Sequence, residues 1–285
     1  MFDNILVPTD GSECAEAAVG YAGDLATRTD ARIHVLCVAD SRTLEHAPQH
    51  DRFKEERTEI AEQTCNELSE SGVSTEQAVR TDIPHKAIRE YATEEDIDLI
   101  VMGTHGRTGV ERFLLGSVTE KVVRLSDVPV LTVTAREDGE VTYPYSDILV
   151  PTDGSKGAEA AIPPAVEIAT TYDARIHPLS VVDTMGMGVE LSTGEILKAL
   201  ENSAQSAVDT VEEQATQASV STVETAIEHG TPSRRIRSYI DDHDIDLVVM
   251  GTHGRSGIER YLLGSVAEKI VRTSTAPVLT VRQPE

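Results

Sequence analysis

The chain has 285 residues and a formal net charge of −24, with no Trp and three Phe. No apolar run approaches the roughly 18 residues of a membrane-spanning helix, so we expect no membrane partner. The acidic charge repels nucleic acid at long range, which argues against a nucleic-acid partner. The first residues, Met1-Phe2-Asp3-Asn4, lack the basic and apolar regions of a signal peptide, so we expect a cytoplasmic protein.

The acidic composition also suggests an environment. Only six of the 25 basic residues are Lys, against 49 Asp and Glu. This balance is typical of halophilic cytosolic proteins. At about 1 M salt the electrostatic screening length falls to roughly 3 Å, so repulsion between the acidic side chains would no longer destabilise the fold. An ordinary acidic protein of a mesophile is the alternative.

The three cysteines, Cys14, Cys37 and Cys65, form no CxxC pair and have no metal-type spacing. We interpret them as reduced thiols, with Cys37 inside a buried strand. A redox role for them is the less favoured alternative.

An internal repeat divides the chain into two copies of one domain. The segment Ile5–Ser12 recurs as Ile148–Ser155, and Ile97–Val133 recurs as Ile245–Val281 with 28 of 37 positions identical. Polar and turn residues without apolar periodicity separate the copies. We therefore predict domains over residues 1–136 and 146–285, joined by a linker over 137–145.

Each copy alternates strands and helices. Continuous apolar strands indicate a sheet covered on both faces, so we predict two tandem doubly wound, Rossmann-like α/β domains, each with a five-stranded, mainly parallel sheet. Ligands of such sheets bind beyond the carboxyl ends of the strands, at the switch point. In the first copy we expect, in chain order, a strand at 4–8, a helix at about 15–26, a strand at 33–38, a helix at 52–71, a strand at 75–79, a helix at 84–95, a strand at 98–102, a helix at 117–125 and a strand at 130–133.

Three loops lie at the predicted carboxyl ends: Pro8–Ser12, Val38–Asp40 and the Gly-rich segment Gly103–Ser117. Glycines let a backbone approach a ligand closely and turn its N–H groups inward. Ser117 then opens a helix, where free N–H groups and the helix dipole attract an anion. The loops therefore predict an anion-binding site in each copy.

The spacing Gly-x2-Gly-x9-Gly-Ser occurs at Gly103 to Ser117 and again at Gly251 to Ser265. With the Pro-Thr-Asp-Gly-Ser start, the x-x-Pro turn before the third helix and the closing Pro-Val-Leu-Thr-Val strand, it resembles ATP-binding members of the universal stress protein (UspA) family. The resemblance covers both halves nearly end to end. It implies an adenine-nucleotide-hydrolase-like fold that binds ATP, or another adenine nucleotide, in a stress-response or regulatory role.

The resemblance also implies contacts. The triphosphate would lie along the Gly-rich loop and the start of the following helix. The aspartate after strand one would contact the ribose or a metal on the phosphates. The backbone after strand two would contact the adenine. The implied metal, Mg²⁺ or Mn²⁺, would be held through the nucleotide by Asp10 and Asp153. The implied cofactor-binding residues are Pro8, Thr9, Asp10, Val38, Gly103, Thr104, His105, Gly106, Arg107, Thr108, Gly109, Gly116, Ser117, Val118 and Thr119, and in the second copy Pro151, Thr152, Asp153, Val181, Gly251, Thr252, His253, Gly254, Arg255, Ser256, Gly257, Gly264, Ser265, Val266 and Ala267.

Several of these residues have structural alternatives. Asp10 would instead cap the first helix, although Ser12 is available for that role. Ser117 with Glu120 matches a capping box, as does Ser265 with Glu268. His105 and His253 have no second His or Cys nearby, so we favour loop packing or a phosphate contact over metal binding.

The sequence departs from the family pattern at two places. Asp82-Ile-Pro84 replaces the usual Gly-x-Pro that the second copy keeps at Gly230, so we expect Asp82 in a left-handed backbone with mild strain. Pro163-Pro164 stands where the first copy has Gly20-Tyr21. A proline inside a helix costs about 3 kcal/mol, so we expect a bend that puts the geometry of Asp153 in doubt.

Three functions compete: an ATP-binding stress-response protein, a slow ATPase or adenine-nucleotide hydrolase, and a nucleotide-free interaction module. The chain has no Walker lysine loop, and we identify no catalytic residue, so binding is favoured over catalysis. Val130–Val133 and Val278–Val281 are short apolar strands. We expect the two domains to pair through them as an intramolecular pseudo-dimer, with a further homodimer as an option.

Overall fold

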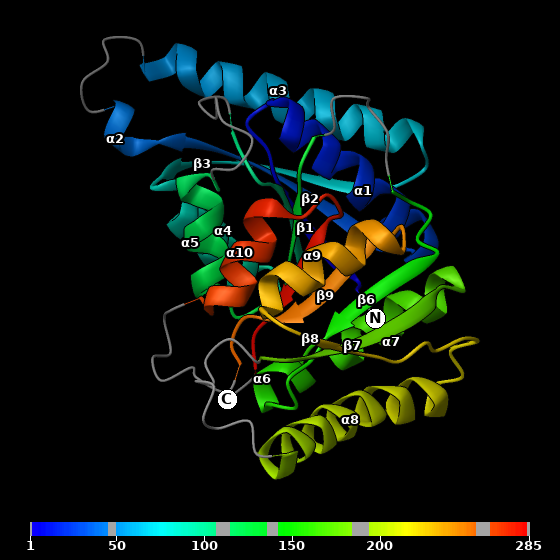
Figure 1. The fold of residues 1–285 in the computed structure, drawn as a ribbon. Helices are drawn as coiled ribbons and strands as arrows, with labels where there is room; N and C mark the ends of the chain where they lie inside the picture. Colours follow the sequence, from blue (N-terminus) through cyan, green and yellow to red (C-terminus); the bar gives the residue numbers. More distant parts are fainter. Residues whose placement is uncertain are drawn as a thin grey trace. The chain divides into compact units, whose positions relative to one another are not determined.

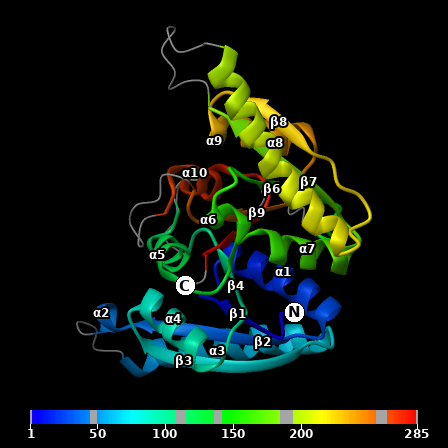
Figure 2. The same ribbon diagram turned by 90° about the horizontal axis from the view of Figure 1, so that it is seen from below.

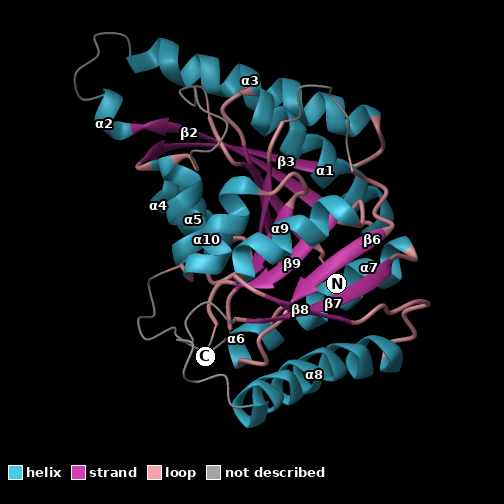
Figure 3. Cartoon of the chain, in the orientation of Figure 1, coloured by secondary structure: helices cyan, strands magenta, loops and turns pink. Residues whose placement is uncertain are grey.

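The computed structural model describes residues 2–44, 50–106, 115–135, 142–183, 194–254 and 263–283. The chain divides into two compact units, Met1–Val141 and Thr142–Glu285. In each unit helices flank a parallel sheet, which confirms the predicted fold class (Figures 1 and 3). No helix in the described part of the chain is long and apolar enough to cross a membrane.

The first unit has the strand order β3-β2-β1-β4-β5, with parallel neighbours. Helices α1 and α3 cover one face of this sheet, and α4 and α5 cover the other (Figure 1). The chain order reverses between β1 and β4, so the switch point lies there. The elements are β1 (Asn4–Pro8), α1 (Glu13–Thr29), β2 (Arg32–Asp40), α2 (Ser41–Leu44), α3 (His50–Glu70), β3 (Ser74–Asp82), α4 (Pro84–Glu94), β4 (Leu99–Gly103), α5 (Ser117–Leu125) and β5 (Val130–Val133).

The central strands make the core of the first unit. Ile5, Leu6, Ile33 and Ile100 are fully buried. Burying each such side chain contributes about 1.5–3 kcal/mol, so these runs hold β1, β2 and β4 in register beneath the loops. Cys37 lies in β2 and is also buried, as its apolar neighbours predicted.

The second unit repeats this architecture with the order β10-β9-β6-β7-β8. Figure 2 shows α8 lying along β7 and β8. The elements are β6 (Asp147–Pro151), α6 (Lys156–Glu159), α7 (Ile162–Tyr172), β7 (Arg175–Val182), α8 (Gly194–Gln217), β8 (Ala226–His229), α9 (Pro232–Asp242), β9 (Leu247–Gly251), α10 (Ser265–Thr273) and β10 (Val278–Val281).

The paired prolines interrupt the first helix of the second unit, as expected. Where α1 is continuous, the second unit has two helices separated at Ala160–Ala161. Pro163 and Pro164 occupy the start of α7, where a missing N–H costs little. The interruption between α6 and α7 therefore lies on the N-terminal side of the prolines and not at the prolines themselves.

The connection before α4 differs from our expectation. Asp82 is not among the described residues with positive φ, so the predicted left-handed backbone is wrong. Instead β3 continues to Asp82, which pairs with Asp40 of β2. The Oδ1 atom of Asp82 accepts the N–H of Ile83 at 2.6 Å. In the second unit β8 ends earlier and Gly230 takes a φ of 131°.

Residues 137–141 of the predicted linker lie outside the described residues. From Thr142 onward the chain packs on the second unit, because the Thr142 hydroxyl donates to the carbonyl of Asp246 at 2.9 Å. Tyr145 is buried, with its ring centroid 4.8 Å from that of Tyr172.

Candidate functional site

The first unit has a cavity of about 380 Å³ beyond the carboxyl ends of β1, β2 and β4. The three predicted loops meet there, because parallel strands bring their carboxyl ends to one edge. The cavity is lined by Pro8, Thr9, Asp10, Ala15, Leu36, Val38, Ala39, Asp40, Phe53, Arg57, Pro84, Ile88, Met102, Gly103, His105, Gly106, Gly116, Ser117, Val118 and Thr119.

The second unit has a cavity of about 440 Å³ at the same place. Every described residue that we predicted for the second site lines it. The full set is Pro151, Thr152, Asp153, Ala158, Leu179, Ser180, Val181, Val182, Asp183, Leu200, Ala204, Pro232, Ile236, Met250, Gly251, Thr252, His253, Gly254, Gly264, Ser265, Val266 and Ala267.

Part of each Gly-rich loop is outside the described residues. This concerns Arg107, Thr108 and Gly109 in the first unit and Arg255, Ser256 and Gly257 in the second. Thr104 is described but does not line the first cavity. It ties the loop to α5, because its carbonyl accepts the N–H of Gly116 at 2.8 Å.

Helix α5 presents its first turn to the cavity. Its N-cap is Gly116, which has no side chain to satisfy the first N–H groups, and the N–H of Glu120 donates to the Gly116 carbonyl at 2.8 Å. The predicted capping box is therefore wrong, because Ser117 is already inside the helix. Helix α10 begins in the same way at Gly264. The first-turn N–H groups have no partner within the helix, and the helix dipole adds positive potential where Ser117 and Val118 line the cavity.

Asp10 is held beside the Gly-rich loop. Its Oδ1 accepts the N–H of Ser12 at 3.1 Å, and its Oδ2 lies 2.7 Å from where a β-carbon on Gly106 would stand. The N-cap of α1 is Ser12, so Asp10 does not cap that helix. Asp10 thus closes a local turn while its carboxylate lines the cavity.

Asp153 repeats this arrangement in the second unit. Its Oδ1 accepts the N–H of Ser155 at 3.0 Å, and its Oδ2 lies 2.5 Å from the β-carbon position of Gly254. The break between α6 and α7 therefore leaves the local geometry of Asp153 like that of Asp10. Here Ser155 also caps its helix, since its hydroxyl accepts the N–H of Ala158 at 3.2 Å.

The loop histidines are fixed by their neighbours. His105 Nδ1 lies 3.0 Å from the Thr104 hydroxyl, and His253 Nδ1 lies 2.9 Å from the Thr252 hydroxyl. Burial lowers the pKa of His105, which favours the neutral ring. Each His contributes a buried Nε2 with no hydrogen-bond partner among the described residues. A ring held in this way suits packing or a polar ligand contact.

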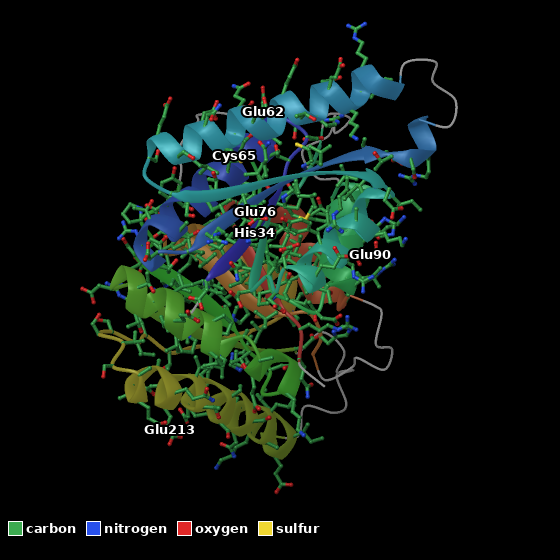
Figure 4. All side chains as sticks on the ribbon, turned by 180° about the vertical axis from the view of Figure 1, so that it is seen from behind. His34, Glu62, Cys65, Glu76, Glu90 and Glu213 are labelled. Carbon is green, nitrogen blue, oxygen red and sulfur yellow. The ribbon has the colours of Figure 1, made fainter. Side chains whose placement is uncertain are left out.

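Among the described residues, one group of side chains is close enough together to hold a metal ion, and it does not line the cavity. His34, Glu76 and Glu95 bring ligand atoms within 4.8 Å of one another near the amino ends of the strands, and Figure 4 labels the first two on β2 and β3. His34 Nδ1 already meets the Tyr91 hydroxyl at 3.1 Å, and Nε2 meets Asn4 Oδ1 at 3.4 Å. Both ring nitrogens therefore have protein partners.

Sequence reasoning missed the wall that α3 supplies. Phe53 and Arg57 line the first cavity, and Arg57 Nη1 donates to the carbonyl of Asp10 at 3.2 Å. No motif marks these residues. Their place in the chain could have indicated them, because a helix that follows the carboxyl end of β2 begins over that edge of the sheet.

The fold and the cavities define a duplicated doubly wound α/β domain with a ligand-sized pocket at each switch point. The model of the universal stress protein family matches residues 1–134 and 144–282, so the chain belongs to that family, with two tandem domains.

Relatives agree with this assignment. A universal stress protein of Methanocaldococcus jannaschii is 36% identical over 144 residues, covering 50% of this chain and 84% of that protein. A universal stress protein of Staphylococcus saprophyticus, named as putative, is 36% identical over 143 residues, covering 50% of this chain and 86% of that protein. The crystal structure of a universal stress protein from Archaeoglobus fulgidus matches at a TM-score of 0.75 and 26% identity, covering 100% of both chains.

Proposed function

We propose that each unit binds one adenine nucleotide, ATP in the first instance, and that the chain acts as a nucleotide-responsive stress protein. One observation carries the proposal. In both units a cavity joins a Gly-rich loop, an aspartate after the first strand and a helix N-terminus whose cap is a glycine.

The phosphate end of each cavity suits an anion. The first turns of α5 and α10 line the two cavities, and a phosphate there accepts hydrogen bonds from N–H groups that the helix leaves free. Gly106 and Gly254 allow the loop backbone to approach. The positive potential at the helix N-terminus offsets the repulsion between the phosphates and the net negative charge of the chain.

The other end of each cavity suits a base and a sugar. Val38 and Val181 lie near the carboxyl ends of β2 and β7, and each lines its cavity together with an isoleucine, Ile88 or Ile236. The volumes of about 380 and 440 Å³ lie within the usual range for small-ligand sites, roughly 300–1,000 Å³. We place the adenine against these valines.

A divalent cation fits this arrangement only through the nucleotide. Asp10 and Asp153 each supply one carboxylate, and one of its two oxygens already accepts a backbone N–H. Mg²⁺ usually keeps several waters and binds through one or two carboxylates and substrate phosphates. The carboxylate therefore serves either the ribose or a phosphate-bound metal.

Titration calorimetry of the purified chain with ATP in high salt tests the proposal. The expected stoichiometry is near two per chain, and mass spectrometry of the denatured protein should identify released adenine nucleotide. Folded protein that binds no adenine nucleotide would overturn the proposal, and a value near one would overturn the second site. Sustained phosphate release over many turnovers would favour the slow-ATPase alternative.

A further inference from the structure

The two cavities have the same plan but different walls at one place. The helix over the carboxyl ends of the strands supplies Phe53 and Arg57 to the first cavity. In the second cavity the corresponding helix supplies Leu200 and Ala204. The aromatic ring and the guanidinium of the first wall are thus replaced by two aliphatic side chains.

The ends of the two helices establish that these positions correspond. After α3 the N–H of Val73 donates to the carbonyl of Leu68, and after α8 the N–H of Val220 donates to that of Ala215. Counting back from these equivalent bonds pairs Arg57 with Ala204. The difference is therefore a substitution at one helical position and not a shift of the helix along the sheet.

This substitution changes the charge of the cavity. The described walls of the first cavity hold Asp10, Asp40 and the cation Arg57. Those of the second hold Asp153 and Asp183, with no Lys or Arg among its described lining residues. Each Gly-rich loop also carries two arginines at equivalent positions, Arg107 and Arg112 in the first unit and Arg255 and Arg260 in the second, so these charges do not distinguish the cavities.

Arg57 is placed to act on a ligand. Its Nη1 donates to the carbonyl of Asp10, which fixes the guanidinium beside the loop that carries the Asp10 carboxylate. A guanidinium has five N–H donors in a rigid fork, which suits bidentate contact with phosphate oxygens. A hydrogen bond to a charged group stabilises more than a neutral one, so one such contact changes affinity by about tenfold.

We infer that Arg57 makes the first cavity selective for the charge of the phosphate chain, whereas the second cavity binds the same nucleoside with a weaker dependence on phosphate number. This inference rests on the proposed function. It names Arg57 as a specificity-determining residue and predicts two unequal nucleotide sites in one chain.

The test measures each cavity separately in the full-length chain, without divalent cations and at one moderate salt concentration. Gly254→Val blocks the second cavity and Gly106→Val blocks the first, and calorimetry then gives the affinities for ATP and for adenosine. The ratio of ATP affinity to adenosine affinity should be about tenfold larger at the first cavity. Arg57→Ala should remove this excess and leave adenosine affinity within about twofold, while Arg57→Lys should retain part of it.

The reciprocal variant makes the test sharper. Ala204→Arg, in the chain with the first cavity blocked, should raise the preference of the second cavity for ATP. Arg28→Ala is the matched control, because Arg28 lies on α1 paired with Asp24, outside both cavities. Equal ratios at the two cavities, or an unchanged ratio in Arg57→Ala, would overturn the inference and leave the proposed function standing. Failure of ATP and adenosine to bind either cavity would instead overturn the proposed function.

Discussion

Gly106 faces Asp10 so closely that a β-carbon on the glycine would stand 2.7 Å from the Oδ2 atom of the aspartate. Real β-carbons essentially never approach another atom this closely, so a side chain at Gly106 must displace the carboxylate. The same carboxylate accepts the Ser12 N–H through its other oxygen, Oδ1. The glycine and the aspartate therefore depend on each other for their positions.

The double variant Gly106→Val, Gly254→Val should abolish nucleotide binding while the α/β fold persists. The atoms that must move are the ends of two aspartate side chains and not the sheet. Calorimetry with ATP tests the loss of binding, and far-ultraviolet circular dichroism tests whether the fold persists. Gly194→Ala is the control, because its β-carbon would meet nothing within 4 Å. Normal ATP affinity in the folded double variant would show that the site lies elsewhere.

Asp10→Ala should separate the two possible roles of this carboxylate. If Asp10 holds a metal on the phosphates, the variant loses ATP affinity mainly when Mg²⁺ or Mn²⁺ is present, and if it binds the ribose the loss is equal without metal. The folded state should also lose about 1 kcal/mol, because the Ser12 N–H loses its acceptor. Binding titrations with and without metal distinguish these results. Ser117→Ala should be milder than Asp10→Ala, because it keeps the helix N–H groups.

Stability should increase with salt. A net charge of −24 repels itself in dilute buffer, and screening at high ionic strength removes that repulsion. The midpoint of thermal unfolding should therefore rise between dilute buffer and about 2 M KCl. Potassium and sodium chloride should act alike if screening is the cause. A midpoint that stays constant or falls would argue against adaptation to salt and would leave nucleotide binding unaffected.

Acid should destabilise the first unit through His34. Burial lowers the pKa of His34, although nearby Glu76 and Glu95 oppose the shift. The unfolded chain therefore binds the proton more readily, so the free energy of unfolding falls as the pH drops from about 6.5 towards the lowered pKa. Urea titrations from pH 8 to pH 5 at constant salt should show a smaller slope for His34→Gln than for the parent chain. Equal slopes would exclude this contribution.

We also propose that the two units pair through Val130–Val133 and Val278–Val281. Within its own unit each strand has a neighbour on one side, β4 or β9, and ends the strand order. If the strands pair, all their backbone amides should exchange slowly with solvent, because an open edge leaves alternate N–H groups unprotected. Hydrogen exchange measured by nuclear magnetic resonance tests this. Rapid exchange at alternate residues of both strands would contradict the pairing.

The regular elements were predictable where one physical signal dominated. The runs Asn4–Pro8 and Val130–Val133 are short, apolar and bounded by turn residues, and the structure reproduces both. The limits of α5 were also correct, although its cap was not. A serine followed three residues later by a glutamate fits a capping box, but the N–H of Glu120 donates to the carbonyl of Gly116, so the N-cap is the glycine and not Ser117.

Features set by tertiary contact were less predictable. The extension of β3 to Asp82 depends on pairing with β2, because its own sequence is polar. The cavity wall from α3 depends on where a long helix crosses the sheet, and neither Phe53 nor Arg57 belongs to a motif. The Gly-rich loops were recognisable because their spacing is local.

The replacement of Arg57 by Ala204 has a consequence that follows from covalent linkage. Two separate gene products with different ligand preferences would vary in abundance, and their combined response would vary with expression. Here one polypeptide carries both pockets, so synthesis always delivers them in equal numbers. If the pockets bind the nucleotides that we propose, a cell that makes this chain obtains a fixed pair of binding sites, and the balance between ATP and adenosine decides how each is filled.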